Sequence, residues 1–150
     1  MKYSILLVLF TLSTSCLGQK SAILTPEQLT LAFIQDYYDW NQYAFRTDEG
    51  IGSNEKAIEK KYRQIIRKYC IPNKDYQGIT FGSESNHHPE HEQIVGTDVG
   101  ALKTIVKTHF NDPKHPYSFA DYEYHFLLSK GKWLLEEVYY VDGEEKYKAL

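Results

Sequence analysis

Residues Tyr122–Val138 read YEYHFLLSKGKWLLEEV, and this stretch predicts a β-hairpin. Aromatic residues alternate with the polar Glu123 and His125, which is the period-two pattern of a half-buried strand. Ser129-Lys130-Gly131 supplies the turn. We therefore expect one strand over residues 117–128 and a final strand over 132–141, closed by Asp142-Gly143. Upstream, residues 102–110 also alternate and predict a further strand, followed by a turn over 111–116.

Two helices are predicted before these strands. Thr25-Pro26-Glu27-Gln28 combines an N-cap, a proline at the first helical position and a capping-box glutamine. Apolar residues at helical spacing extend this helix to an end near 46–52, and a second helix runs from about Asn54 to Cys70, where Pro72 stops it. Residues 73–89 predict a long loop with one short strand around 78–81.

Helices followed by an antiparallel meander predict an α+β domain, with the helices packed on one face of a curved, mostly antiparallel sheet. The apolar faces of these elements predict one shared core. Four of its members are Phe33, Tyr37, Trp133 and Leu135.

The first eighteen residues are predicted to be a signal peptide, because Lys2, a short apolar run and small residues through Gly18 follow one another. Export to the periplasm or the exterior is expected, and cleavage before a lipid-modified Cys16 is the alternative. After cleavage at Gly18 only Cys70 remains, and its place at the end of an amphipathic helix predicts a buried, inert thiol. Residues 19–150 then form a single domain.

Composition narrows the range of possible functions. The chain has 150 residues, 42% of them hydrophobic and 25% charged, with a formal net charge of −3, which is typical of a soluble globular protein and gives no reason to expect nucleic acid as a partner. The sequence has no Gly-rich phosphate loop and no serine elbow, and the chain after cleavage at Gly18 has no cysteine pair, so we assign no cofactor. No segment after residue 18 is apolar enough to predict a transmembrane span.

Residues 87–92, His-His-Pro-Glu-His-Glu, are the densest group of metal-ligand types. Pro89 disfavours the regular helix that would place spaced ligands on one face. We therefore interpret this stretch as a solvated polar loop and assign no metal.

Several carboxylates could act as acids or bases. Glu123 is predicted on the same strand face as His125, and Asp36 and Asp39 lie among tyrosines of the first helix. Each arrangement is also ordinary for a half-exposed element, so we assign no catalytic residue. In Glu136-Glu137 one carboxylate is expected to face inward unless a bulge re-aims it.

The closing hairpin resembles that of the nuclear-transport-factor-2-like superfamily, in which a glycine turn, Lys-Trp and an aliphatic residue introduce the final strand. Within that superfamily the chain is most similar to the fold immunity proteins of bacterial polymorphic toxin systems. The similarity lies in residues 40–45, residues 65–70 and Gly131-Lys132-Trp133. The resemblance implies a conical fold and a protein that blocks a toxin without catalysis.

The sequence thus predicts a non-enzymatic binder, an immunity protein whose partner is a cognate toxin; a homodimer is left open. An isomerase- or dehydratase-type enzyme, or a ligand-binding protein using the cone, is the alternative. The predicted contact residues are Tyr139, Tyr140, Asp142, Glu144, Glu145 and Tyr147, with the loop 73–89 as a further contact. The candidate pocket residues are Tyr37, Trp40, Tyr122, Tyr124 and Glu137.

Overall fold

The structure, a computed structural model, describes residues 23–48, 54–112, 114–115 and 118–150. The predicted signal peptide and the alternative lipid-anchor residue Cys16 lie outside the described residues. Within the described part of the chain, no helix is both long and apolar enough to cross a membrane.

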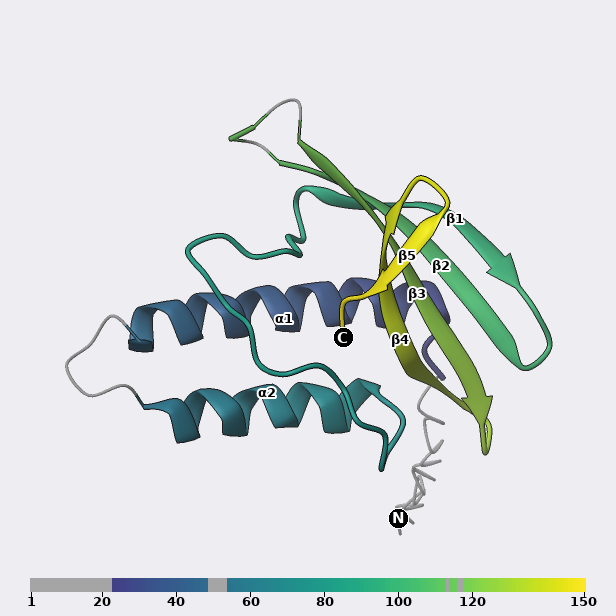
Figure 1. Cartoon of the computed structure of the whole chain (residues 1–150). Coiled ribbons are helices and arrows are strands. Elements are labelled where there is room, and N and C mark those ends of the chain that lie inside the picture. Colours follow the sequence, from purple (N-terminus) through teal and green to yellow (C-terminus); the bar gives the residue numbers. More distant parts are fainter. Residues whose placement is uncertain (1–22, 49–53, 113, 116–117) are drawn as a thin grey trace, which may run out of the picture.

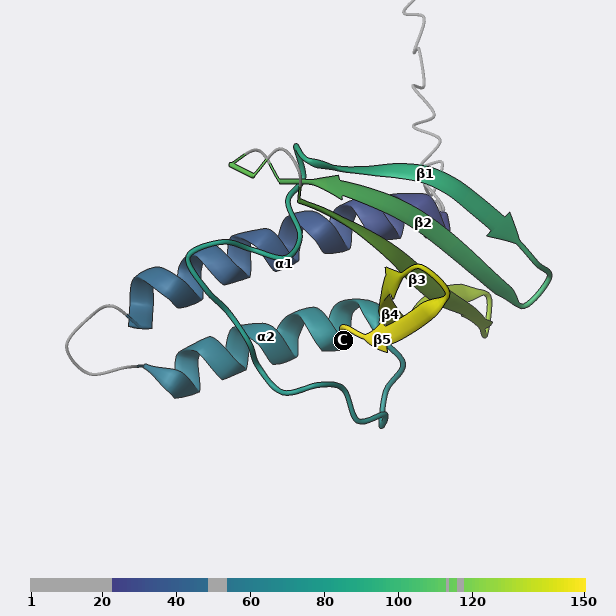
Figure 2. The ribbon, with the colours of Figure 1, turned by 45° about the horizontal axis from the view of Figure 1, so that its top comes forward.

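The predicted α+β class is confirmed, with two helices packed against one five-stranded sheet. Figures 1 and 2 show both helices on the same side of the sheet. Every pair of neighbouring strands is antiparallel, and the strands follow one another in sequence order. The elements are α1 (Pro26–Asp48), α2 (Glu55–Tyr69), β1 (Glu92–Val99), β2 (Lys103–Asn111), β3 (Phe119–Ser129), β4 (Lys132–Asp142) and β5 (Glu145–Lys148).

The capping box predicted at the start of α1 is present. The Gln28 amide donates to Thr25 Oγ1 over 3.3 Å, and the Thr25 amide donates to Gln28 Oε1 over 3.0 Å. These bonds satisfy backbone donors that a helix start leaves unpaired. Both helices end within the predicted bounds, so the capping and periodicity arguments are confirmed.

The predicted hairpin between β3 and β4 is also confirmed. Lys130 and Gly131 both have positive φ, 49° and 76°, as a two-residue turn of the type that matches strand twist requires. Further along, His125 pairs with Glu137 and Phe126 pairs with Leu135, so a bulge is present at Glu136. Glu137 is the inward member of the glutamate pair, with 1% of its surface exposed.

One predicted strand is wrong, and two strands were missed. Residues 78–81 form no strand, whereas β1 and β5 were not predicted. β1 has a bulge between Ile94 and Gly96, which leaves Val95 65% exposed and breaks the alternation that would have identified the strand. All four residues of β5 are exposed, so pairing with β4 rather than burial holds this strand in place.

The core lies between α1, α2 and the inner face of the sheet. Phe33, Tyr37 and Leu135 are buried in it, as predicted. Trp133 packs against this core, but it is only partly buried and lies at the margin, so its predicted membership is confirmed only in part. The Cys70 thiol is buried, as predicted, and burial raises its pKa to about 12.

Candidate functional site

The carboxylates of α1 are held by neighbouring side chains. Asp36 forms an ion pair with Lys68 over 2.6 Å and accepts a hydrogen bond from the Tyr69 hydroxyl over 2.8 Å. Asp39 is exposed and accepts a hydrogen bond from Gln35 over 3.1 Å. The Asp36 contacts join α1 to α2, so a structural role accounts for this carboxylate.

Glu123 and His125 do lie together, on the face of the sheet opposite the helices. Glu123 Oε2 is 2.8 Å from His125 Nε2, and Lys146 of β5 donates to both carboxylate oxygens over 2.8 and 2.9 Å. Burial alone would raise the pKa of Glu123, but Lys146 and His125 more than offset this and hold the pKa below its ordinary 4.5. Glu123 is therefore an ionised partner that ties β5 to β3.

Glu137 is neutralised inside the molecule. Lys74, from the loop after α2, and Lys148, from β5, each lie 3.3 Å from Glu137 Oε2. Lys74 also donates to the Glu136 carbonyl. The two lysines join the loop after α2 and β5 to this buried carboxylate, so a structural role accounts for Glu137.

A buried polar cluster that the sequence did not predict lies between the loop and the sheet. It comprises His87, Glu92, Thr108 and Tyr124, each at most 2% exposed. Glu92 Oε2 is 2.9 Å from His87 Nδ1, and Glu92 Oε1 accepts hydrogen bonds from Thr108 (2.6 Å) and Tyr124 (2.7 Å). The interpretation of residues 87–92 as a solvated loop is wrong for His87 and Glu92.

Electrostatics explain why a carboxylate is tolerated there. Burial would raise the pKa of Glu92, but the adjacent His87 and the two hydroxyl donors more than compensate and hold the pKa below its ordinary 4.5. The His87 ring also packs against Tyr37 and Tyr122, with ring centroids 5.1 and 4.7 Å apart. The cluster therefore fastens residue 87 to the sheet.

The loop is also fastened to α1. The Asn41 side chain donates to the Gly82 carbonyl over 2.9 Å and accepts from the Gly82 amide over 3.2 Å. Figure 1 shows the loop crossing from the end of α2 over α1 toward β1. The loop predicted as a contact element is thus held to the sheet at His87 and to α1 at Gly82. These contacts fix its position beside the sheet and α1.

A pocket of about 440 Å³ lies between this loop, α1 and the strands. Tyr38 of α1, Tyr122 of β3 and Tyr140 of β4 line it, together with Ser83–Asn86 and Phe110. We call it the tyrosine pocket. Both of its acidic lining residues have partners: Glu84 is 2.8 Å from Lys114, and Asp112 is 2.7 Å from His115.

The predicted contact residues are split by strand alternation. Tyr140 pairs with Tyr147 and Asp142 pairs with Glu145, and paired residues share a face, so these four lie together. Tyr140 joins them to the tyrosine pocket, with its ring centroid 6.0 Å from Tyr122 and 6.4 Å from Tyr147.

Tyr139 lies on the other face of β4, 4.8 Å from the His125 ring, so the prediction that it shares one surface with the others is wrong. Glu144 is exposed in the turn between β4 and β5.

The five predicted pocket residues do not share one cavity. Of them only Tyr122 lines the tyrosine pocket. Tyr37 and Tyr124 fill the core beside Phe33, and burial raises the pKa of Tyr37 to about 12. Trp40 borders a shallow hollow between α1 and α2, and Glu137 is enclosed by its lysines. The prediction of a shared pocket is wrong because aromatic side chains occupy the space under the sheet.

A larger hollow, of about 970 Å³, lies between α2 and residues 71–79. Arg63, Arg67 and Lys74 line it, together with apolar residues such as Ile66 and Leu134. Residues 73–79, part of the loop predicted as a further contact, line it, but none of the six predicted contact residues near the C-terminal end and none of the candidate pocket residues does. We favour the tyrosine pocket as the functional site because predicted residues from separate strands converge there.

Comparisons of the chain with protein-family models, with curated proteins and with solved structures found no match.

Proposed function

We propose that the protein is a non-enzymatic binder, an immunity protein that neutralises a cognate toxin by occluding it. We further propose that it has the conical nuclear-transport-factor-2-like fold. The support for the fold is the resemblance of the closing hairpin together with two helices on one face of an antiparallel sheet. The support for binding comes from the surface around the tyrosine pocket.

One observation carries this proposal: the tyrosine pocket continues into the β4–β5 hairpin as a single aromatic and acidic surface. Tyr122, Tyr140 and Tyr147 form a row across three neighbouring strands, and Asp142 and Glu145 extend it at the hairpin end. Aromatic anchors surrounded by a polar rim are the usual composition of an energetic protein contact. The acidic rim suits a partner segment that carries basic side chains.

The alternative, a small-molecule enzyme or ligand-binding protein, draws on the same pocket, whose volume is within the range of ligand sites. Against an enzyme, the candidate acids Asp36, Glu123 and Glu137 each lie in an ion pair outside this pocket. Occlusion requires a fixed surface and no perturbed acid or base. The binder is therefore the better supported proposal.

Tyr140→Ala is expected to weaken binding to the toxin-domain protein encoded by the adjacent gene by about 2 kcal/mol, roughly thirtyfold in Kd. The reason is the loss of the ring that joins the pocket to the hairpin. Isothermal titration calorimetry measures the change. Tyr139→Ala is a matched control, because it removes the same side chain from the same strand on the opposite face.

Equal losses in the two variants would contradict the proposed surface. The enzyme alternative would be correct if the purified protein converted a ketosteroid-like or hydroxylated small molecule and lost that activity in a variant of Asp36, Asp39, Glu123 or Glu137. The proposal of a non-enzymatic binder would then be wrong. Full toxin affinity in Tyr140→Ala would also contradict the proposal.

Export is part of the proposal, since it determines where the protein meets a toxin. The pattern of residues 1–18 supports cleavage before Gln19. Intact-mass analysis of the protein isolated from cell fractions is expected to show a chain that begins at Gln19. Acyl chains on Cys16 would indicate a lipid anchor instead, and a retained Met1 would contradict export.

A further inference from the structure

The turn at residues 88–91 brings together three side chains that can bind a metal. Pro89 disfavours a regular helix here, and the chain forms a tight turn instead. The His91 amide donates to the His88 carbonyl over 3.1 Å, and the Glu92 amide donates to the same carbonyl over 2.9 Å. This turn places the rings of His88 and His91 side by side, with centroids 4.4 Å apart.

We propose that His88, Glu90 and His91 form a binding site for a divalent transition metal ion of the zinc class. Their ligand atoms all lie within 4.8 Å of one another. In a tetrahedral site two ligands at about 2.0–2.2 Å from the zinc ion lie roughly 3.3–3.6 Å apart, so side-chain rotations that shorten these separations by about 1 Å would bring all three ligands to bonding distance. Two imidazoles and one carboxylate are a donor set that zinc accepts when a fourth position is left open.

The turn is held in place from several sides. The Asn111 amide, at the end of β2, donates to the His91 carbonyl over 3.0 Å. Tyr38 of α1 packs against the His88 ring, with centroids 4.4 Å apart. The next residue along the chain, Glu92, belongs to the buried cluster. Ligand preorganisation of this kind lowers the entropy cost of binding a metal.

The ring of His88 already presents a lone pair inside the turn. Its Nδ1 accepts a hydrogen bond from the Glu90 amide over 3.2 Å. A metal at this nitrogen would replace one long hydrogen bond with a coordinate bond. Glu90 is exposed, so its carboxylate can rotate toward the rings at little cost.

A second group of possible ligands, Glu84, Asp112 and His115, also has its ligand atoms within 4.8 Å of one another. Lys114 forms an ion pair with Glu84, and Asp112 accepts hydrogen bonds from the Lys114 and His115 amides. An ammonium group beside the carboxylates competes with a cation. The His88 turn has two imidazoles and no lysine within ion-pair distance among the described residues, so it is the better site.

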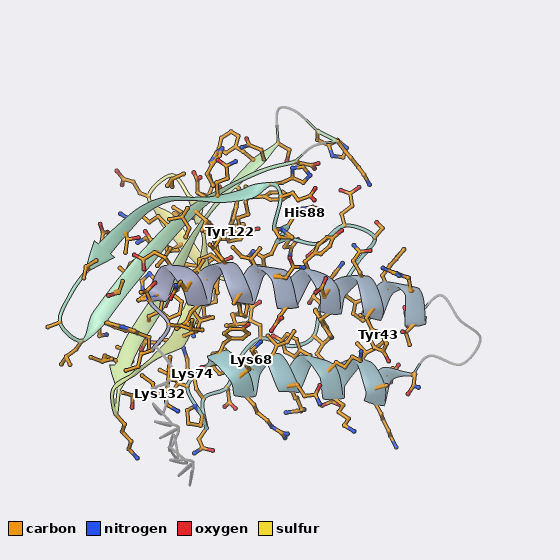
Figure 3. All side chains as sticks on the ribbon, turned by 180° about the vertical axis from the view of Figure 1, so that it is seen from behind. Tyr43, Lys68, Lys74, His88, Tyr122 and Lys132 are labelled. Carbon is orange, nitrogen blue, oxygen red and sulfur yellow. The ribbon has the colours of Figure 1, made fainter. Side chains whose placement is uncertain are left out.

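The proposed metal would lie at the rim of the tyrosine pocket, because His88 is also one of the residues that line it. Figure 3 shows His88 and Tyr122 on the same side of α1. Three protein ligands leave a fourth position for water or for a side chain of a bound partner. The site does not depend on the proposed immunity function, because its test needs no toxin.

The test uses the chain from Gln19 onward, purified without a histidine tag and stripped of metal with a chelator. Titration with zinc chloride, measured by isothermal titration calorimetry, is expected to show one zinc site per chain. Cobalt(II) is expected to give the visible absorption of a tetrahedral complex. His91→Ala and Glu90→Gln are expected to weaken zinc binding by more than about tenfold. Losing a side chain that only supports a ligand already weakens metal binding by about tenfold or more, and these variants change a ligand itself.

His115→Ala and His109→Ala are the matched controls, since each removes a histidine outside the turn. Both are expected to leave zinc affinity unchanged. Glu90 is exposed, so Glu90→Gln keeps the test valid if a histidine variant fails to fold. No zinc binding at millimolar concentration, or binding that is lost in His115→Ala but kept in His91→Ala and Glu90→Gln, would overturn the proposal.

Discussion

Glu92→Ala is expected to lower the free energy of unfolding by about 3–5 kcal/mol, because it breaks a buried charge network by removing one partner. Both Thr108 and Tyr124 donate to the Glu92 carboxylate, and His87 lies 2.9 Å from it. After the substitution the Thr108 hydroxyl would remain buried without its acceptor, which costs free energy. Tyr124 and His87 would lose the carboxylate as well and keep only each other, since the Tyr124 hydroxyl lies 3.0 Å from His87 Nδ1. Urea denaturation followed by far-UV circular dichroism measures the loss.

Glu90→Ala is the matched control for this prediction. It removes the same side chain two residues away, in the turn that precedes β1, but from an exposed position, so a change within about 0.5 kcal/mol is expected. Glu92→Gln keeps an oxygen that can accept from Thr108 or Tyr124 and is expected to lose less than Glu92→Ala. Similar midpoints for Glu92→Ala and Glu90→Ala would mean that the cluster does not hold the loop to the sheet.

Trp40→Ala is expected to cost about 3–5 kcal/mol as a buried aromatic truncation. Trp40 is 3% exposed, its Nε1 donates to the Ile58 carbonyl over 3.1 Å, and its ring contacts Tyr37 and Tyr62 with centroids 5.2 and 4.9 Å away. The side chain therefore fastens α1 to α2. Thermal and urea unfolding followed by circular dichroism give the change.

Trp133→Ala supplies the comparison, because Trp133 is partly exposed at the margin of the core. Trp133→Ala is expected to lower the free energy of unfolding by less than Trp40→Ala does, because less apolar surface is buried at Trp133. The two variants retain one tryptophan each, so fluorescence reports separately on the helix pair and on the hairpin. A larger loss in Trp133→Ala would contradict this account of the core.

Local signals explain which elements could be predicted. The start of α1 is specified by the four residues from Thr25 to Gln28, and the β3–β4 turn by Lys130-Gly131; each acts through bonds or dihedral angles within a few residues. β1 and β5 lack such signals, because a bulge interrupts one and the other is exposed along its whole length. Their pairing partners, rather than their own residues, make them strands.

The site was only partly predictable for a related reason. Neighbouring residues of a strand point to opposite faces, so the sequence alone could have predicted that Tyr139 and Tyr140 lie on different faces of the sheet. Glu92 was not within reach, because its partners Thr108 and Tyr124 come from two other strands whose register the sequence does not specify. The one available signal was the pair of hydroxyl side chains on inward-facing strand positions, which need a buried acceptor.

The central claim is that the surface running from the tyrosine pocket to the β4–β5 hairpin binds the toxin. Amide hydrogen exchange of the protein alone and with the toxin-domain protein from the adjacent gene tests it most directly. The account predicts added protection in residues 83–88, 118–122 and 140–147, with little change in α2. Protection confined to α2 or to β1, with those three segments unchanged, would contradict it.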